Sequence, residues 1–172
     1  QTVIPDDIEA GTWMMAAAMT QGDVTLQNVI PTHITPIMAK LREAGVEIHE
    51  MADAVRVIGR ERPKAINVKT LPYPGFPTDA QSQMTALLSL ADGTSYVTET
   101  LYDDRFRFVP ELVRMGAQIR VEGRTAIVKG VERLYGAPVE ATDIRAGAAL
   151  VIAGLAAEGE TTIYGLEHVQ RG

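Results

Sequence analysis

The chain has 172 residues, of which 46% are hydrophobic and 22% charged, enough to bury one sizeable core or two small ones. Its formal net charge of −6 argues against a nucleic-acid-binding surface, which normally carries a basic stripe. The absence of cysteine excludes disulfides, thiolate metal sites and cysteine-based catalysis within this chain.

No apolar run is long enough to span a membrane. The longest, residues 146–157, is interrupted by Gly147 and Gly154 and is typical of a buried helix. The first residues also lack the charged and then apolar pattern of a signal peptide. We therefore expect a soluble, cytoplasmic protein that contacts neither membrane nor nucleic acid. Because the sequence starts without Met and stops at an Arg-Gly pair, we interpret it as an engineered piece, a processed piece or one part of a longer chain.

Paired glycines reveal an internal repeat. The members of each pair are 71 residues apart: Gly22 and Gly93, Gly45 and Gly116, and Gly59 and Gly130. The sequences around the middle pair are also similar, LREAGVEI in the first copy and LVRMGAQI in the second. A third copy starts near Asp143 and is cut short. The expected units are residues 3–70, 71–140 and 141–172, which form one partial domain.

Each unit is predicted to open with a buried helix. Residues 13–19 and 84–90 are apolar nearly all round, unlike an amphipathic surface helix. An acidic or hydroxyl residue precedes each helix as its expected N-cap: Asp6 with Glu9, Thr78 with Gln81, and Thr142 beside Asp143. The expected C′ residues that end these helices are Gly22, Gly93 and Gly159.

A strand should follow each first helix, at residues 24–29, 95–100 and 161–164. A second helix comes next, with apolar residues at helical spacing over 34–41 and 108–115, and ends at Gly45 or Gly116. Two short strands close the unit, at 46–49 with 54–58 and at 118–122 with 125–129. The pattern predicts an α-β-α-β-β unit in an α/β or α+β repeat architecture, not a Rossmann fold.

A segment with three prolines, residues 71–78 (LPYPGFPT), connects the first two units. These prolines impose an extended, poorly mobile approach to the helix start at Asp79. An Asp in the first turn of a helix is usually only a cap. The stiff approach favours a functional carboxylate at Asp79.

Two copies of the repeat place an arginine at the expected start of the second helix, Arg105 and Arg171. A cation there opposes the helix macrodipole, and the arrangement makes sense if an anion is bound by the guanidinium and the backbone N–H groups. The alternative for Arg105 is a plain ion pair with Asp103 or Asp104. Asp143 and Arg145, two residues apart, are more typical of a structural pair.

No metal or cofactor is indicated. The three histidines, His33, His49 and His168, share no metal-ligand spacing. The sequence also contains no glycine-rich phosphate loop of the Rossmann or P-loop kind.

Several long motifs resemble the UDP-N-acetylglucosamine 1-carboxyvinyltransferases, in that family's order and across essentially the whole chain. They are residues 3–12 (VIPDDIEAGT), 76–81 (FPTDAQ), 98–100 (TET), 104–106 (DRF), 110–117 (PELVRMGA), 141–146 (ATDIRA) and the terminal Arg-Gly. The resemblance implies part of the C-terminal catalytic domain. Its fold would be repeated βαβαββ-type units in an inverted α/β barrel-like enolpyruvyl transferase domain.

The resemblance also implies a function. Members of the family are cytoplasmic bacterial enzymes of peptidoglycan synthesis with the active site between two domains. They transfer the enolpyruvyl group of phosphoenolpyruvate to the 3-hydroxyl of UDP-N-acetylglucosamine and release phosphate. The implied partners are these two small molecules.

The resemblance assigns roles to particular residues. Asp79, in the FPTD motif, matches the carboxylate that contacts the sugar hydroxyl and acts as general base, with a pKa that a closed, dry cleft can raise. Leu101 matches a position that contacts the nucleotide sugar through its backbone. Arg171 matches the arginine that holds phosphoenolpyruvate or the leaving phosphate. The remaining matches in the cleft are Arg105, Asp143 and Arg145.

Important parts of the family's active site have no counterpart in this sequence. The opening segment with its phosphoenolpyruvate-binding lysine is absent, as is the opposite domain with its mobile loop, its cysteine and a further arginine. Because catalysis needs groups from both sides of the cleft, we expect the chain alone to be inactive. We also expect it to self-associate, because apolar faces around residues 150–155 lack their usual cover.

Two alternatives stay open. The first is a piece of a 3-phosphoshikimate 1-carboxyvinyltransferase, which is disfavoured because FPTD and TDIRA belong to the nucleotide-sugar branch. The second is a non-catalytic repeat domain that folds without the rest of an enzyme.

Overall fold

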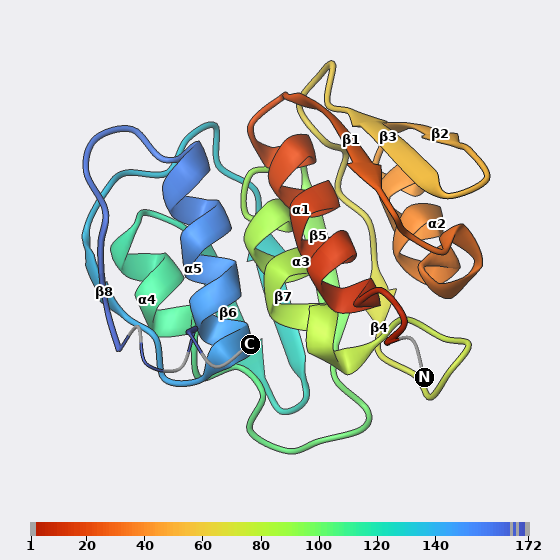
Figure 1. Cartoon of the computed structure of the whole chain (residues 1–172). Coiled ribbons are helices and arrows are strands. Elements are labelled where there is room, and N and C mark those ends of the chain that lie inside the picture. Colours follow the sequence, from red (N-terminus) through yellow and green to blue (C-terminus); the bar gives the residue numbers. More distant parts are fainter. Residues whose placement is uncertain (1–2, 166, 168, 171–172) are drawn as a thin grey trace.

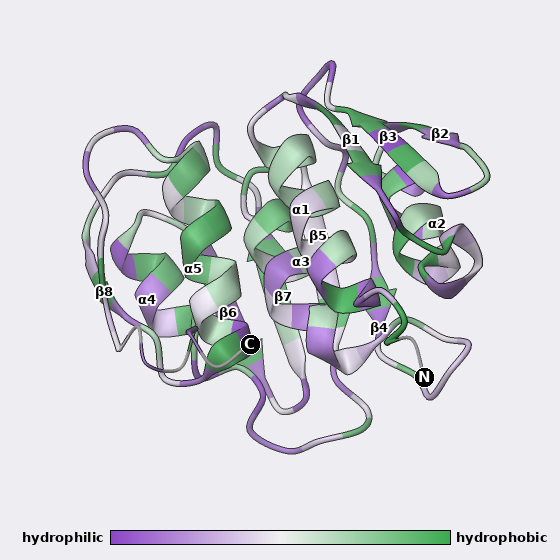
Figure 2. Cartoon of the chain, in the orientation of Figure 1, coloured by the Kyte–Doolittle hydropathy of each residue, from purple (hydrophilic) through white to green (hydrophobic). Residues whose placement is uncertain are grey.

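Three largely buried helices pack against one another in the middle of the molecule (Figure 1). In this computed structural model, which describes residues 3–165, 167 and 169–170, they are α1 (Asp7–Met19), α3 (Gln81–Leu88) and α5 (Ile144–Ala156). Their fully buried side chains include Met14, Met84 and Leu150. Figure 2 shows that α5 is hydrophobic along most of its length, while the loops around it are largely hydrophilic. The predicted burial of these helices is confirmed.

Small sheets and two shorter helices flank this centre. The first sheet is antiparallel, in the order β1 (Asp23–Gln27), β3 (Ala54–Ile58), β2 (Glu47–Glu50). The second has the order β4 (Val68–Lys69), β5 (Thr94–Thr98), β7 (Thr125–Lys129), β6 (Gln118–Glu122). The third pairs β8 (Pro138–Glu140) with β9 (Thr162–Tyr164). The shorter helices are α2 (Thr35–Glu43) and α4 (Val109–Arg114).

Two of the three predicted caps are formed. The Asp6 carboxylate accepts hydrogen bonds from the N–H groups of Ile8 and Glu9 at 2.8 and 3.0 Å. Asp143 caps α5 in the same way. The expected cap at Thr78 is wrong, because this hydroxyl bonds Glu99 instead and the chain enters α3 through a short 3-10 turn, Thr78–Ala80. A tertiary partner has displaced the local one.

The glycines after the helices behave in two ways. Gly45 and Gly116 occupy C′ positions as predicted, with φ of +89° and +96°. The C′ prediction for the others is wrong. After α1 the left-handed residue is Gln21, with φ of +53°, while Gly93 and Gly159 lie farther on, in the turns that lead to the next strands. There the positive φ belongs to a turn and not to a helix end.

Two short strands were not predicted. β4 and β8 precede α3 and α5, and each pairs in parallel with the strand after that helix, β5 or β9. Runs of two or three residues carry too little alternation to be recognised. With these strands included, the chain has the mixed α/β architecture expected from the resemblance. The division into three units stays a prediction.

No helix of the described residues is long and apolar enough to cross a membrane.

Candidate active site

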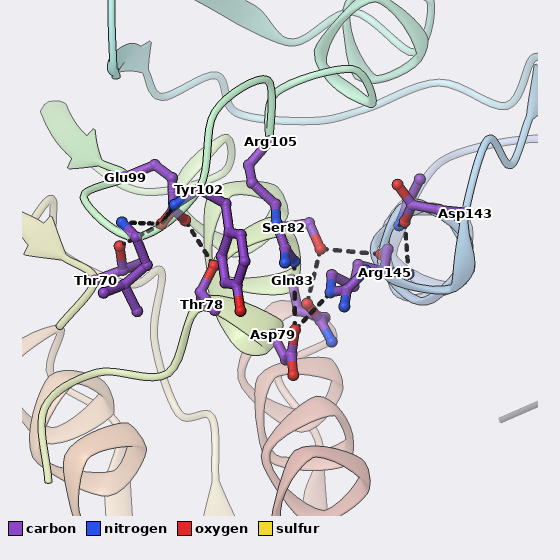
Figure 3. A network of polar contacts seen from close by, with 12 residues as sticks. Thr70, Thr78, Asp79, Ser82, Gln83, Glu99, Tyr102, Arg105, Asp143 and Arg145 are labelled. Carbon is purple, nitrogen blue, oxygen red and sulfur yellow. Dashed lines mark hydrogen bonds and ion pairs between the residues drawn. The ribbon is translucent and has the colours of Figure 1, made fainter. Parts of the chain in front are cut away.

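Asp79 lies where three distant segments of the chain meet (Figure 3). It belongs to the short turn that leads into α3, at the end of the proline-rich segment. Arg145, from the first turn of α5, donates through Nε to Asp79 Oδ1 at 2.6 Å. Arg105, from the loop after β5, donates through Nη1 to the same oxygen at 3.3 Å. The carboxylate thus faces two cations.

The two arginines determine the protonation state of Asp79. Partial burial raises the pKa of this carboxyl, but the hydrogen bonds and charges of Arg145 and then Arg105 outweigh burial and leave it below its ordinary 3.8. The raised pKa expected for a closed, dry cleft is therefore not what these contacts produce. Asp79 is ionised at neutral pH, and its side chain is 48% exposed. Among the described residues, both contacts use Oδ1, which leaves Oδ2 available to a ligand hydroxyl.

Arg105 is held from two sides. Its guanidinium carbon lies 4.2 Å from the centroid of the Tyr102 ring, a cation–π contact, and its side chain is 18% exposed. The alternative pairing with Asp103 or Asp104 is not formed, because those carboxylates bond Arg124 and Arg107. The expected place of Arg105 at a helix start is also wrong. The chain turns after Asp104, whose φ is +59°, and α4 begins only at Val109.

Arg145 is positioned through its own backbone. Asp143 accepts the Arg145 N–H at 2.9 Å, so this carboxylate holds the main chain of Arg145 and not its guanidinium. On the facing helix, Ser82 Oγ lies 3.0 Å from the Arg145 carbonyl oxygen and 2.9 Å from Gln83 Oε1. The Gln83 amide in turn donates to Thr12 of α1 at 3.0 Å. A polar network thereby ties α1, α3 and α5 together beside Asp79.

Glu99 is a polar residue of this region that sequence reasoning missed. Its side chain is 1% exposed, and its carboxylate accepts hydrogen bonds from the hydroxyls of Thr70 and Thr78, each at 2.8 Å. The signal was present in the sequence. Ser95 and Val97 point to the buried face of β5, and continuing their alternation places Glu99 on the same face.

Leu101 follows Glu99 in the same loop. Its side chain is 36% exposed, and its backbone N–H donates to Glu99 Oε1 at 2.9 Å. The loop therefore presents Leu101 near Tyr102 and Arg105. Arg171, the predicted phosphate-binding arginine, lies outside the described residues, as does His168. Within the described part of the chain, no group of three His, Cys, Asp or Glu side chains is placed to hold a metal.

A cavity of about 490 Å³ opens beside Asp79. Asp79, Gln83 and Arg145 are among the polar residues that line it, and Trp13 and Ile144 are among the apolar ones. A slightly larger hollow of about 550 Å³, between α2 and the second sheet, contains neither Asp79 nor its arginines. The first cavity therefore combines space for an organic ligand with an ionised carboxylate and a guanidinium, the groups that recognise hydroxyls and anions.

Comparison with known proteins identifies the family. The family model of EPSP synthase (3-phosphoshikimate 1-carboxyvinyltransferase) matches residues 1–172. A relative from Desulfofundulus thermocisternus, named UDP-N-acetylglucosamine 1-carboxyvinyltransferase, is 62% identical over 170 residues, which cover 99% of this chain and 70% of that protein. The chain belongs to the UDP-N-acetylglucosamine 1-carboxyvinyltransferases. The family predicted from the motifs is confirmed.

A second relative is considerably longer than this chain. UDP-N-acetylglucosamine 1-carboxyvinyltransferase 3 of Symbiobacterium thermophilum is 95% identical over 172 residues, all of this chain and 41% of that protein. The chain therefore spans about 41% of the length of this relative.

Solved structures agree with this fold. The enolpyruvyl transferase NikO from Streptomyces tendae superposes with a TM-score of 0.88 at 28% identity, over 100% of this chain and 41% of that one. EPSP synthase from Acinetobacter baumannii, at 23% identity, has a TM-score of 0.79 over 97% of this chain and 42% of that one, and supports the fold alone.

Proposed function

We propose that this chain forms the sugar-binding side of an active site that transfers enolpyruvyl from phosphoenolpyruvate to the 3-hydroxyl of UDP-N-acetylglucosamine. One observation carries the proposal. Asp79 is an ionised, half-exposed carboxylate whose Oδ1 is held by two arginines beside a cavity of about 490 Å³. The names of the relatives support this choice of substrate. The proposal places the protein in the cytoplasm, in peptidoglycan synthesis, as the motif resemblance implies.

In this proposal Asp79 acts as general base. The sugar hydroxyl donates a hydrogen bond to Oδ2 and passes its proton there as its oxygen bonds to C2 of phosphoenolpyruvate. Forming this bond opens the C2=C3 double bond, and C3 takes a proton from an acid on the missing side of the cleft. Loss of a proton from C3 then restores the double bond as the bond between C2 and the phosphate oxygen breaks, and phosphate leaves. An anionic substrate that draws either arginine away from Oδ1 would raise the pKa of Asp79 toward the range useful to a base. The missing side of the cleft supplies the remaining groups.

Other site residues have supporting roles. Arg145 and Arg105 orient the carboxylate and offer positive charge to phosphate or carboxylate groups of the substrates. Asp143 keeps α5 and Arg145 in place, and Leu101 offers its backbone to the nucleotide sugar. Arg171 holds phosphoenolpyruvate or phosphate in this proposal, on the strength of the Arg-Gly motif alone.

Calorimetric titration of the chain with UDP-N-acetylglucosamine tests the proposal. We expect binding, weakened about tenfold or more in Asp79→Ala because a charge-assisted hydrogen bond to the sugar is lost. Asp92→Ala is the matched control, since Asp92 is an aspartate whose side chain is 80% exposed and which does not line the Asp79 cavity. Its affinity should equal that of the unsubstituted chain.

The same titration addresses the rival substrate, 3-phosphoshikimate, whose transferase gives the family model its name. We expect it not to displace UDP-N-acetylglucosamine. Displacement by 3-phosphoshikimate, or equal affinity of Asp79→Ala and the unsubstituted chain, would contradict the proposed substrate or the proposed role of Asp79.

A further inference from the structure

Glu99 has no role in the proposed reaction. It is a buried carboxylate in the same loop that carries Arg105. No lysine or arginine of the described residues forms an ion pair with it. Burying a charge without a counter-ion is costly unless hydrogen bonds satisfy it. We propose that Glu99 is a positioning residue that fixes Asp79 relative to Arg105 and Leu101. This inference rests on the proposed function.

The first contact of Glu99 reaches the helix start that carries Asp79. Glu99 Oε2 accepts the Thr78 hydroxyl at 2.8 Å, and Thr78 directly precedes Asp79. The proline-rich segment before it offers few other anchors, because Pro72, Pro74 and Pro77 have no N–H to donate. The Thr78 hydroxyl therefore connects the end of this segment to the end of β5.

The second contact reaches the loop that carries Arg105. Glu99 Oε1 accepts the N–H groups of Leu101 at 2.9 Å and Tyr102 at 3.3 Å. The Tyr102 ring lies against the Arg105 guanidinium, which in turn donates to Asp79. One carboxylate thus holds both the base and the residues that face it (Figure 3).

A third contact anchors Glu99 itself. The Thr70 hydroxyl, at the end of β4, accepts the Thr100 N–H at 2.9 Å, so its own proton points to Glu99 Oε1 at 2.8 Å. Oε1 thus accepts hydrogen bonds from three donors, the Thr70 hydroxyl and the N–H groups of Leu101 and Tyr102. Hydrogen bonds to a buried charged group are among the strongest in proteins, so this junction should be rigid.

The test uses a full-length enzyme, the Symbiobacterium thermophilum relative with its matching segment replaced by this sequence. We expect Thr78→Val to lower kcat about ten- to a hundredfold, because small misplacements of a catalytic group have effects of this size. The KM for phosphoenolpyruvate should stay within about twofold, whereas Thr78→Ser, which keeps the hydroxyl, should restore kcat to within about threefold.

Thr98→Val is the matched control. This substitution removes the 3.0 Å hydrogen bond between the hydroxyls of Thr98 and Thr125, which joins β5 to β7. That bond involves neither Asp79 nor Glu99. We expect Thr98→Val to keep kcat within about twofold while changing the melting temperature as much as Thr78→Val does. Equal kcat losses in the two variants, or no loss in Thr78→Val, would overturn the positioning role.

Glu99→Gln supplies a readout that does not depend on turnover. The uncharged amide weakens the bonds from Leu101 and Tyr102, so hydrogen exchange of these two amides should accelerate about tenfold or more. Unchanged exchange would overturn the proposal. Inactivity of the unsubstituted full-length enzyme would instead count against the proposed function and leave this exchange result to decide on Glu99.

Discussion

At the scale of single residues, the site depends on two arginines that share one carboxylate oxygen. Arg145 Nε and Arg105 Nη1 lie 2.6 and 3.3 Å from Asp79 Oδ1. Their positive charges overcome the effect of partial burial and lower the pKa of Asp79. Asp79 is therefore both a proposed base and the counter-ion that keeps two cations close together. Its removal should affect stability as well as activity.

We expect Asp79→Asn to lower the free energy of unfolding at neutral pH by about 0.5–1 kcal/mol, a small effect because the ion pairs are partly exposed. A carboxyl whose pKa is lowered on folding stabilises the protein above its ordinary pKa and loses this contribution as pH falls through the folded value. The difference between the two proteins should thus be constant above about pH 5 and shrink below 3.8. Urea unfolding across this pH range measures it, and a difference that widens in acid would contradict the lowered pKa.

At the scale of secondary structure, the repeated glycines are explained by contacts between elements. In the first copy Gly59 donates its N–H to the Gly22 carbonyl at 2.9 Å, and in the second Gly130 donates to Gly93 at 2.8 Å. In both copies the backbone of the donor glycine lies close to the backbone at the C-terminal end of a buried helix. A Cβ on Gly59 would lie 2.9 Å from the Ala17 carbonyl oxygen, and one on Gly130 would lie 1.6 Å from that of Ala91. The repeat therefore preserves a backbone approach that only glycine permits.

Gly130→Ala should accordingly lower the free energy of unfolding by about 3 kcal/mol or more, because a backbone atom of Ala91 would have to move. Gly123→Ala is the matched control. That glycine has φ of +59° but no heavy atom within 4 Å of an added Cβ, so only the conformational cost of about 1 kcal/mol applies. Urea denaturation of both variants gives the comparison, and equal losses would show that the close approach is relaxed at little cost.

At the scale of the whole molecule, apolar side chains stay exposed on the central helices. Leu150 and Ile152 are buried, so the expectation of an uncovered face across residues 150–155 is wrong for these positions. Their side chains pack into the core that α5 shares with α1 and α3. Leu155 is 56% exposed, and Trp13 and Ile144, in the wall of the Asp79 cavity, are 49% and 40% exposed. Because these three apolar side chains are exposed, self-association stays a prediction.

Sedimentation of the chain over a range of concentrations should reveal self-association, and Leu155→Glu should weaken it by placing a charge on the exposed part of α5. Val113→Glu is the matched control, because Val113 is 45% exposed on α4, which is not one of the three central helices. A chain that stays monomeric at high concentration would contradict the prediction. Equal effects of the two substitutions would show that the self-association contact does not depend specifically on Leu155.

Sequence patterns alone were sufficient to predict the family, the three buried helices, the caps at Asp6 and Asp143 and the helix ends at Gly45 and Gly116. These features follow from local spacing, backbone conformation and long motifs, which a linear sequence contains. It also singled out Asp79, through the stiff proline-rich approach.

The groups that contact Asp79 could not be predicted from local sequence and became clear from the folded chain. Arg105 bonds the carboxylate of Asp79, from another segment, and not that of the neighbouring Asp104. The Thr78 hydroxyl bonds Glu99 and does not cap the helix that follows it. Strands β4 and β8 likewise exist only through their pairing with β5 and β9. In each case several partners were compatible with the local sequence. The tertiary arrangement of these segments selected one of them, because it fixes the distances over which charges and hydrogen bonds act.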